Sequence, residues 1–301
     1  MPTPTNCARL LQRAGQNAFT ASLPPGTRSP LCKQERTLSS SPTKSLCALA
    51  LIVLTNPAGA WEFVTEDFPP FTYPAASVGQ RAASADTGGV AAAGPFVDIV
   101  QAVCARLHRD CPISVYPWRR ALALAEEGKV DGIFTVIHSP RREHAFHITR
   151  MLTTSRYSVY APRSSTFVYH QPQDMAGKTI GVYGPSGTSF ALRERLQQVP
   201  GVSIRLVADN RRLLRMLEAG RFGSQGLAVL NQDVAWHLIE TERLDQLREV
   251  GELQPVSYGI GLSRQRVSTA QFEAFEAQLE ALIADGTVPA ILRRYQLEAA
   301  F

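Results

Sequence analysis

Long hydrophobic runs are scarce in this sequence of 301 residues. The longest, residues 46–54, has nine residues, whereas a helix that spans a membrane needs about 20 apolar residues. The sequence also lacks heptads, internal repeats and blocks of like charge, which excludes coiled coils, solenoids and charged interaction tails. These absences predict a globular protein with no stable membrane insertion.

The apolar run at residues 46–54 belongs to a different pattern. Lys44 precedes it, and the small residues Ala58-Gly59-Ala60 follow it. A charged flank, a short apolar core and a small-residue cleavage site form a secretory signal. We therefore expect a leader of residues 1–60 that is cut before Trp61, and a mature protein that is exported.

The formal net charge of +5 comes from the leader. Residues 1–60 hold six basic side chains and one acidic side chain, which leaves 25 of each sign in residues 61–301. Binding to nucleic acid requires a basic surface that faces the phosphates. The balanced mature chain predicts no such surface and no nucleic-acid partner.

Cysteine is also rare. Three of the five cysteines lie in the leader, and the mature chain keeps only Cys104 and Cys111. An isolated pair in an oxidising compartment is a disulfide candidate, and two buried free thiols are the alternative. We expect the disulfide, which should contribute only about 2–3 kcal/mol because its loop is short.

Apolar periodicity in the mature chain alternates between strands and helices, which predicts α/β architecture with mostly parallel sheets. Residues 74–94 are rich in Ala, Gly and Ser and are expected to form a surface insertion. The expected strands are residues 61–65, 113–116, 132–136, 179–183 and 227–230. The expected helices are one from Phe96, 119–127, one carrying Leu192 and Leu196, 211–219, one from about Val234, and 271–285. Two α/β lobes fit this order better than one continuous sheet.

Several short motifs occur in a recognisable order. They are Pro70-Phe71, Asp98, Cys104-x6-Cys111, Gly128-Lys129-Val130-Asp131-Gly132, Ser139-Pro140-Arg141-Arg142 with Ile148-Thr149, Gly177-Lys178-Thr179-Ile180-Gly181-Val182, Gly187-Thr188-Ser189, Asp285-Gly286-Thr287 and Arg294-Tyr295. In this order the chain resembles the family 3 bacterial extracellular solute-binding proteins, and among them the lysine/arginine/ornithine- and histidine-binding proteins.

The resemblance implies a two-lobed periplasmic-binding-protein fold of type II. Lobe 1 would comprise residues 61–157 and 259–301, and lobe 2 residues 158–258, with a hinge of two segments between them. A small polar ligand, with a carboxylate as the favoured group, would bind between the closing lobes. The protein would be a periplasmic monomer that serves the permease of an ABC importer, with no cofactor and no metal.

The resemblance also implies an anion clamp made by both lobes. Arg142, in the motif Ser139-x-x-Arg142, would bind the ligand's carboxylate, because a planar guanidinium can hold it with two hydrogen bonds. Across the cleft, Gly187, Thr188 and Ser189 lie between a strand and a helix, where free N–H groups and hydroxyls form an anion site. A solvated arginine and a simple helix N-cap are the alternatives.

Further residues are expected to line the cleft. Phe68 and Trp118 would stack on the ligand, contributing about 0.5–2 kcal/mol. Glu66 and Asp67 lie at the end of the first strand, and either could hold a cationic group or could be a solvated loop acid. Thr135 is a ligand-binding residue by the same resemblance.

One departure from the family puts an ordinary α-amino acid ligand in doubt. Relatives that bind α-amino acids carry an aspartate for the ammonium in a slot that here holds Asn231 or Gln232. Asp233 could serve only with a shift of register. The acidic position is therefore filled by Asp233, filled by Glu66, or absent, and Asn231 is the expected cleft residue.

Two other functions compete with transport. An exported enzyme with this fold, such as a dehydratase, is one, but no G-x-S-x-G nucleophile motif occurs. A sensory ligand-binding protein is the other. His138, His144 and His147 match no metal-binding spacing and are expected to be solvated loop residues. We therefore expect a binding protein and no enzyme.

Overall fold

The computed structural model describes residues 59–75 and 90–301. The expected signal and nearly all of the leader lie outside the described residues, as does most of the expected insertion. The described ends of that insertion are not loops, because β2 (Tyr73–Pro74) and β3 (Val90–Ala93) pair as antiparallel strands. In the part of the chain that is described, no helix is long and apolar enough to cross a bilayer.

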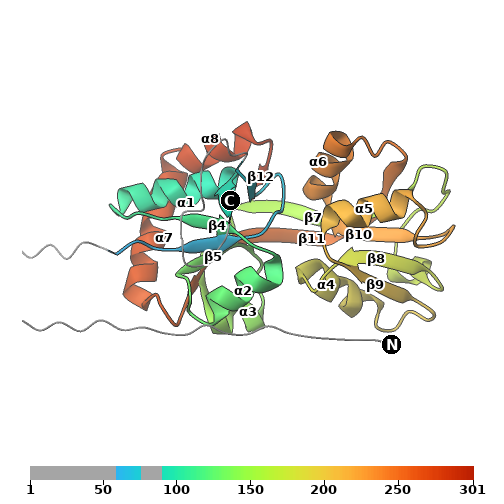
Figure 1. Cartoon of the computed structure of the whole chain (residues 1–301), viewed down its shortest axis with the longest axis horizontal. Coiled ribbons are helices and arrows are strands. Elements are labelled where there is room, and N and C mark those ends of the chain that lie inside the picture. The colour runs from blue at the N-terminus through green and yellow to red at the C-terminus, as the bar shows by residue number, and fades with distance from the viewer. Residues whose placement is uncertain (1–58, 76–89) are drawn as a thin grey trace, which may run out of the picture. The chain divides into compact units, whose positions relative to one another are not determined.

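One lobe has a sheet with helices on both faces (Figure 1). Strand β1 pairs in parallel with β4 and with β5. Alternate β1 residues serve the two faces, since Phe63 packs near Phe275 of α7 while Val64 joins the cluster of Trp118 and Ala121 on α2. The main elements are β1 (Phe63–Thr65), α1 (Pro95–Arg106), β4 (Ile113–Val115), α2 (Trp118–Glu126), β5 (Gly132–Val136), α3 (Pro140–Ala145), β6 (Phe146–Ile148), α7 (Thr269–Ala284), α8 (Thr287–Arg294) and β12 (Glu298–Ala299).

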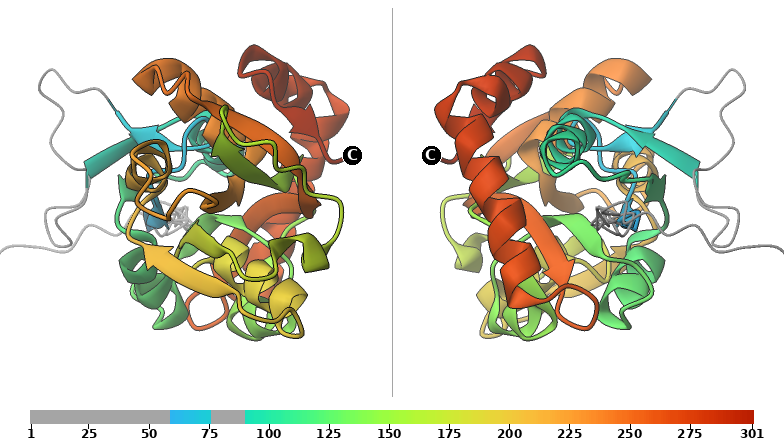
Figure 2. Two further views of the ribbon diagram at one scale, coloured as in Figure 1. Left: turned by 90° about the vertical axis from the view of Figure 1, so that its right-hand side faces the viewer. Right: turned by 90° about the vertical axis from the view of Figure 1, so that its left-hand side faces the viewer.

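Helices from the C-terminal part of the sequence cover the outer face of this lobe. Helix α7 crosses it, with α8 beside it, as the right-hand view of Figure 2 shows. The side chain of Ser268 accepts a hydrogen bond from the backbone of Gln271 and caps the start of α7. Phe275, Leu279 and Leu282 are its buried residues, so the helix predicted at residues 271–285 packs with the face that its periodicity indicates.

The other lobe repeats the alternation. Strand β8 lies between β9 and β10 and pairs in parallel with both. Every residue of β10 is buried, as expected for a strand with helices on both faces. The elements are η1 (Pro172–Met175), β8 (Thr179–Tyr183), α4 (Gly187–Leu196), β9 (Ser203–Val207), α5 (Asn210–Glu218), β10 (Leu227–Asn231) and α6 (Gln232–Glu242).

Two long strands connect the lobes. Strand β11 (Leu247–Ser263) pairs with β7 (Thr153–Pro162) from Leu247 to Tyr258 and with β5 from Gly259 to Leu262. Strand β7 in turn pairs with β10 through residues 157–160. The strand order is therefore continuous, β2-β3-β4-β1-β5-β11-β7-β10-β8-β9, with β6 on β11 and β12 on β7.

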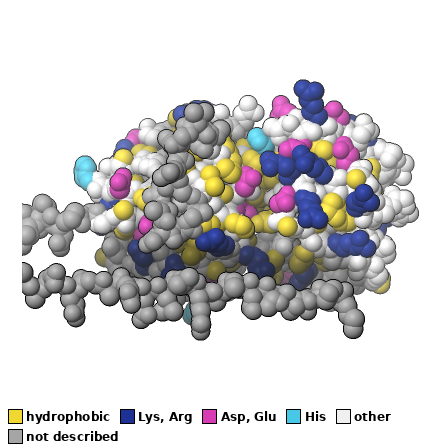
Figure 3. Space-filling model, in the orientation of Figure 1, with side chains coloured by type: hydrophobic (Ala, Val, Ile, Leu, Met, Phe, Trp, Pro, Cys, Tyr) yellow, Lys and Arg dark blue, Asp and Glu magenta, His cyan; other side chains and the backbone are white. Residues whose placement is uncertain are grey.

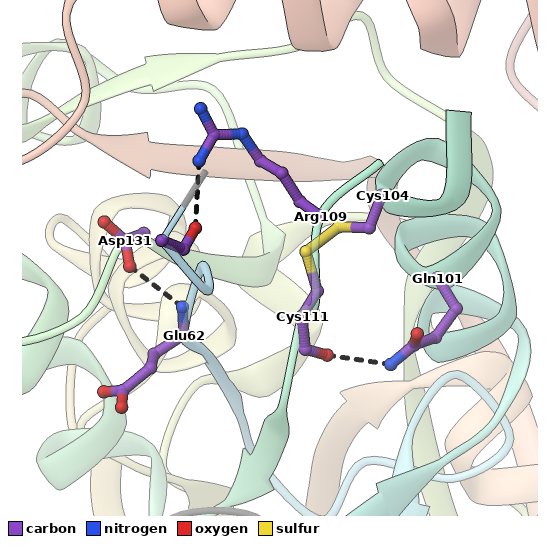
Figure 4. The surroundings of a disulfide bond; sticks show 7 residues. Glu62, Gln101, Cys104, Arg109, Cys111 and Asp131 are labelled. Atoms are coloured by element: carbon purple, nitrogen blue, oxygen red, sulfur yellow. Dashed lines mark hydrogen bonds between the residues drawn. A yellow bond between two sulfur atoms is a disulfide. The ribbon is translucent and has the colours of Figure 1, made fainter. Parts of the chain in front are cut away.

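A disulfide joins Cys104 on α1 to Cys111 just before β4 (Figure 4). This confirms the pairing expected from the sequence. The Cα atoms lie 6.2 Å apart, and Gln101 Nε2 donates a hydrogen bond of 2.8 Å to the carbonyl of Cys111. Both cysteines are buried in the core. The bridge therefore fixes the end of α1 against the start of the next strand.

We predict that replacing both cysteines, Cys104→Ser with Cys111→Ser, lowers the free energy of unfolding by about 2–3 kcal/mol. The reason is that a loop with a sequence separation of only seven residues restricts the unfolded chain modestly. Urea denaturation of the variant and of the parent measures the difference. The control is urea denaturation of the parent protein in the presence of a reductant. A loss of unfolding free energy near zero or above about 5 kcal/mol would contradict the loop-entropy explanation.

Candidate functional site

A cavity lies between the lobes, where the carboxyl ends of β1, β5 and β8 converge. Ligands of open α/β sheets bind outside the carboxyl ends of the strands. Its volume is about 30 Å³, so its walls stand close together. The lining residues are Glu66, Phe68, Trp118, Thr135, Ile137, Arg142, Tyr157, Tyr183, Ser186, Gly187, Thr188 and Tyr258.

Glu66 is the acidic group of the cavity. It follows β1 and is only 8% exposed, and the hydroxyl of Tyr183 at the end of β8 donates a 2.8 Å hydrogen bond to its Oε2. Burial raises the pKa of Glu66 from 4.5 to about 8, with repulsion from Asp67 adding to the rise and the Tyr183 hydrogen bond opposing it. The Tyr183–Glu66 contact links the two lobes directly.

Arg142 is the basic group of the cavity. The side chain of Ser139, the N-cap of α3, accepts a hydrogen bond from the Arg142 backbone N–H. The Arg142 side chain is 11% exposed, and its Nη1 donates to Glu126 Oε1 at 2.8 Å. Its guanidinium carbon lies 5.6 Å from the Trp118 ring centroid, within cation–π range. Burial lowers the pKa of Arg142, and attraction to Glu126 opposes this shift; the guanidinium stays charged.

The start of α4 forms the opposite wall. Ser186 caps the helix by accepting from the backbone of Ser189 at 3.2 Å, while within the described residues the N–H groups of Gly187 and Thr188 have no hydrogen-bond acceptor. Such N–H groups carry the positive end of the helix dipole. A Cβ at Gly187 would meet the Tyr157 hydroxyl at 3.0 Å and Ile137 at 3.1 Å, so glycine permits this close approach.

Thr135 enters the cavity from β5 with an unusual backbone. Its φ of 63° lies in the left-handed region, which β-branched residues rarely adopt. The hydroxyl donates to the Phe134 carbonyl at 2.5 Å, and the side chain is 5% exposed. Strain of this kind concentrates at binding and catalytic sites, at a cost of about 1–3 kcal/mol per residue.

Tyrosines from the two connecting strands form the floor. Burial raises the pKa of Tyr157 to about 12, and interactions of its hydroxyl with Tyr258 and Thr188 oppose the rise. Asn231 Nδ2 donates to the Tyr258 hydroxyl at 3.1 Å. The floor is therefore an uncharged hydrogen-bond network.

Most of the predicted site residues meet at this cavity, and three do not line it. The residues present in the lining are Glu66, Phe68, Trp118, Thr135, Arg142, Gly187 and Thr188. Ser139 and Ser189 instead hold the first turns of α3 and α4. Asn231 is 1% exposed, and its Oδ1 caps α6 by accepting from Val234 at 3.0 Å.

Of the two acidic candidates, Glu66 lines this cavity and Asp233 does not. Asp233 accepts a hydrogen bond from Ser155 and lines a different cavity, and Gln232 donates to Glu249. Five lining residues were not predicted from the sequence: Ile137, Tyr157, Tyr183, Ser186 and Tyr258. Tyr183 carried a usable signal, because it ends a predicted parallel strand.

The three histidines behave differently from one another. His138 contacts Glu143 at 3.0 Å and His144 is exposed, but His147 lies in β6, is 8% exposed and stacks on Phe272. The expectation of three solvated loop histidines is therefore wrong for His147, and His144 is solvated but lies on helix α3. The described residues contain no group of three or more His, Cys, Asp or Glu that could hold a metal ion.

A further cavity is lined by arginines of α5 from one lobe and by Asp67, which follows β1, from the other. Figure 3 shows basic and acidic side chains interspersed on this face. Glu242, for example, accepts from Arg215 and from Arg211, the latter at 2.7 Å. Burial raises the pKa of Asp67, and attraction to Arg211 opposes this. Charges of opposite sign thus face each other beside the cleft.

We predict that Glu66 makes the protein less stable as the pH rises from about 4.5 to about 8. In this window the folded protein keeps the proton on Glu66 while the unfolded chain loses it, so folding weakens by about 1.4 kcal/mol per pH unit. Below the window both states are protonated. Glu66→Gln should show a flatter dependence in urea denaturation at several pH values. Glu273→Gln, which changes an exposed residue of α7, is the control, and equal slopes in parent and Glu66→Gln would contradict the assignment.

Known structures share this fold. A histidine kinase sensor domain with similarity to periplasmic binding proteins superposes with a TM-score of 0.67 at 19% identity, covering 80% of this chain and 97% of that one. An ancestral arginine-binding protein bound to arginine gives 0.66 at 18% identity, covering 79% and 99%. The arginine-, lysine-, histidine-binding protein ArtJ from Geobacillus stearothermophilus gives 0.63 at 16% identity, covering 78% and 94%.

These structures confirm the type II periplasmic-binding-protein fold expected from the sequence. No curated protein sequence matches the chain. The sequence does match the model of one family over residues 63–298, which includes both lobes and every residue that lines the cavity. The chain belongs to the bacterial extracellular solute-binding proteins, family 3.

Proposed function

We propose that the protein captures a small polar solute that carries a carboxylate, such as an amino acid or a related compound, between two closing lobes. Lobe 1 comprises residues 61–157 and 259–301, and lobe 2 residues 158–258. The strand pairing supports this division, because β11 changes partner from β7 to β5 between Tyr258 and Gly259. The protein acts in the periplasm as a monomer, after loss of residues 1–60, and delivers the solute to an ABC importer.

One observation carries the proposal. The cavity brings the guanidinium of Arg142 and the first N–H groups of α4, at Gly187 and Thr188, into one lining. A carboxylate between them would receive charge-assisted hydrogen bonds from both lobes. Since the ligand's affinity for the closed form would exceed that for the open form, binding would favour closure.

The remaining lining residues suit the rest of such a ligand. Glu66 offers a carboxylate for a cationic group, and Phe68 and Trp118 offer aromatic faces. The solved structures named above include binding proteins for arginine, lysine and histidine, which combine a carboxylate with a cationic or aromatic side chain. A solute of that kind is the favoured ligand class.

A sensory role is the second candidate, because the sensor domain of a histidine kinase is among the similar structures. Both roles use the same capture step. Deleting the gene and measuring uptake of the identified solute separates them, since only a transport protein is needed for uptake. Mass spectrometry of the recovered solute tests the enzyme alternative, because a binding protein returns it unchanged.

The ligand can be found by a thermal-shift screen of amino acids, amines, small carboxylates and opines. A ligand at 100 times its dissociation constant stabilises the protein by about 2.7 kcal/mol. Small-angle scattering with the ligand bound then measures closure as a smaller radius of gyration. A screen of these classes without any stabilising compound would contradict the proposed function.

We predict that Arg142→Ala weakens binding of the confirmed ligand by at least about 2–3 kcal/mol, because it leaves a buried carboxylate half-paired. Thr188→Ala should cost only about 1 kcal/mol, since the backbone N–H groups remain. Isothermal calorimetry measures both.

The matched control is Arg141→Ala, because Arg141 neighbours Arg142 but is exposed and lies outside the lining. It should bind almost as the parent does. Normal binding by Arg142→Ala would reject the carboxylate clamp.

A further inference from the structure

Glu126 is a charged group that reaches the site without lining it. It is the last residue of α2, whose first residue is Trp118. Its Oε1 accepts from Arg142 Nη1 at 2.8 Å, and the two side chains are 29% and 11% exposed. Arg142, the proposed anchor of the ligand's carboxylate, is therefore already paired with a carboxylate of the protein.

The pairing changes the charge that a ligand meets. Apart from the tyrosines, Glu66 and Arg142 are the only ionisable side chains in the cavity lining. Glu126, which pairs with Arg142, balances the charge of the guanidinium, and Glu66 adds no full charge at neutral pH because burial raises its pKa to about 8. Charges interact strongly at short range when they are shielded from water. A ligand carboxylate drawn to Arg142 is repelled by Glu126, and a second acidic group on the ligand would find no further cation in the lining.

The contacts around Arg142 allow the charge at position 126 to be removed without moving the guanidinium. The guanidinium is also placed by Trp118, at 5.6 Å from the ring centroid, and the backbone of Arg142 is held by Ser139. A glutamine at position 126 keeps an oxygen that can accept from Arg142. Arg142 should therefore remain in place when Glu126 loses its charge.

We propose that Glu126 is a specificity-determining residue that sets the net charge of the ligand: it selects neutral or cationic carboxylate ligands and rejects acidic ones. This inference rests on the proposed function, since it assumes that Arg142 receives the ligand's carboxylate. It adds a role for Glu126, which lies sixteen residues before Arg142 in sequence and accepts a hydrogen bond from it.

The test compares three probes that share one α-amino acid group: L-glutamine, L-glutamate and L-arginine. Glutamine and glutamate have nearly the same shape and differ in charge. The quantity compared is the association constant of glutamate divided by that of glutamine, measured by calorimetry. In Glu126→Gln this ratio should exceed the parent's by at least about tenfold. Binding of arginine should weaken in the same variant.

Glu127→Gln is the matched control. Glu127 is the next residue, is exposed, and its replacement changes the net charge of the protein equally. Its glutamate to glutamine ratio should stay within about twofold of the parent's. A helix or folding defect would weaken all three probes together and leave the ratio unchanged, so the ratio separates selectivity from structure.

Three outcomes overturn the inference. They are an unchanged ratio in Glu126→Gln, an equal shift in Glu127→Gln, and a parent protein that prefers glutamate or binds none of the probes at millimolar concentration. The proposed function fails separately, when the broader screen yields no ligand or when Arg142→Ala binds the screened ligand normally.

Discussion

The antiparallel pairing of β7 with β11 is the constraint on which the other parts of the site depend. These two strands carry the chain between the lobes, and each pairs with a sheet strand of a lobe, β7 with β10 and β11 with β5. Tyr157 and Tyr258 come from this pair and form the cavity floor. In the proposed closure the walls would approach each other about this connection, and the floor would be common to any degree of closure.

Charge in the cleft is distributed unevenly over the walls. The lobe built on β1 and β5 supplies both Glu66 and Arg142, whereas the start of α4 supplies only dipoles and hydroxyls. Full charges are costly to bury unless they are paired. Here Arg142 is paired with Glu126 and Glu66 accepts from Tyr183. The side chains of Arg142 and Glu66 are therefore hydrogen-bonded while the cavity walls are close together, and among the described residues the N–H groups of Gly187 and Thr188 stay free for a ligand.

Local sequence patterns predicted much of the fold and several residues of the candidate site. Strands β5 and β8 occupy the residues predicted from apolar periodicity, and Arg142 and Thr188 were found through short motifs. Strand β11 was not predicted, because its burial alternates irregularly and Gly251 and Pro255 interrupt the apolar pattern. Its long pairing with β7 depends on residues far away in sequence.

Some single residues also could not be placed correctly from local sequence patterns. Asn231 was placed in the cleft by analogy of register, but it stands just before a helix, where asparagine is a favoured N-cap, and it serves there. The pairing of Glu126 with Arg142 depends on how α2 and α3 pack, which no local pattern states. The left-handed backbone of Thr135 likewise has no signal in sequence, since threonine seldom adopts it.

The hydrogen bond between Tyr183 and Glu66 has a consequence for proton stoichiometry. With a pKa of about 8, Glu66 is mostly protonated at neutral pH when Tyr183 is its partner. A cationic group that took the place of the Tyr183 hydroxyl would favour the ionised carboxylate. Capture would then release close to one proton into the surroundings, and the heat measured by calorimetry would vary with the ionisation enthalpy of the buffer.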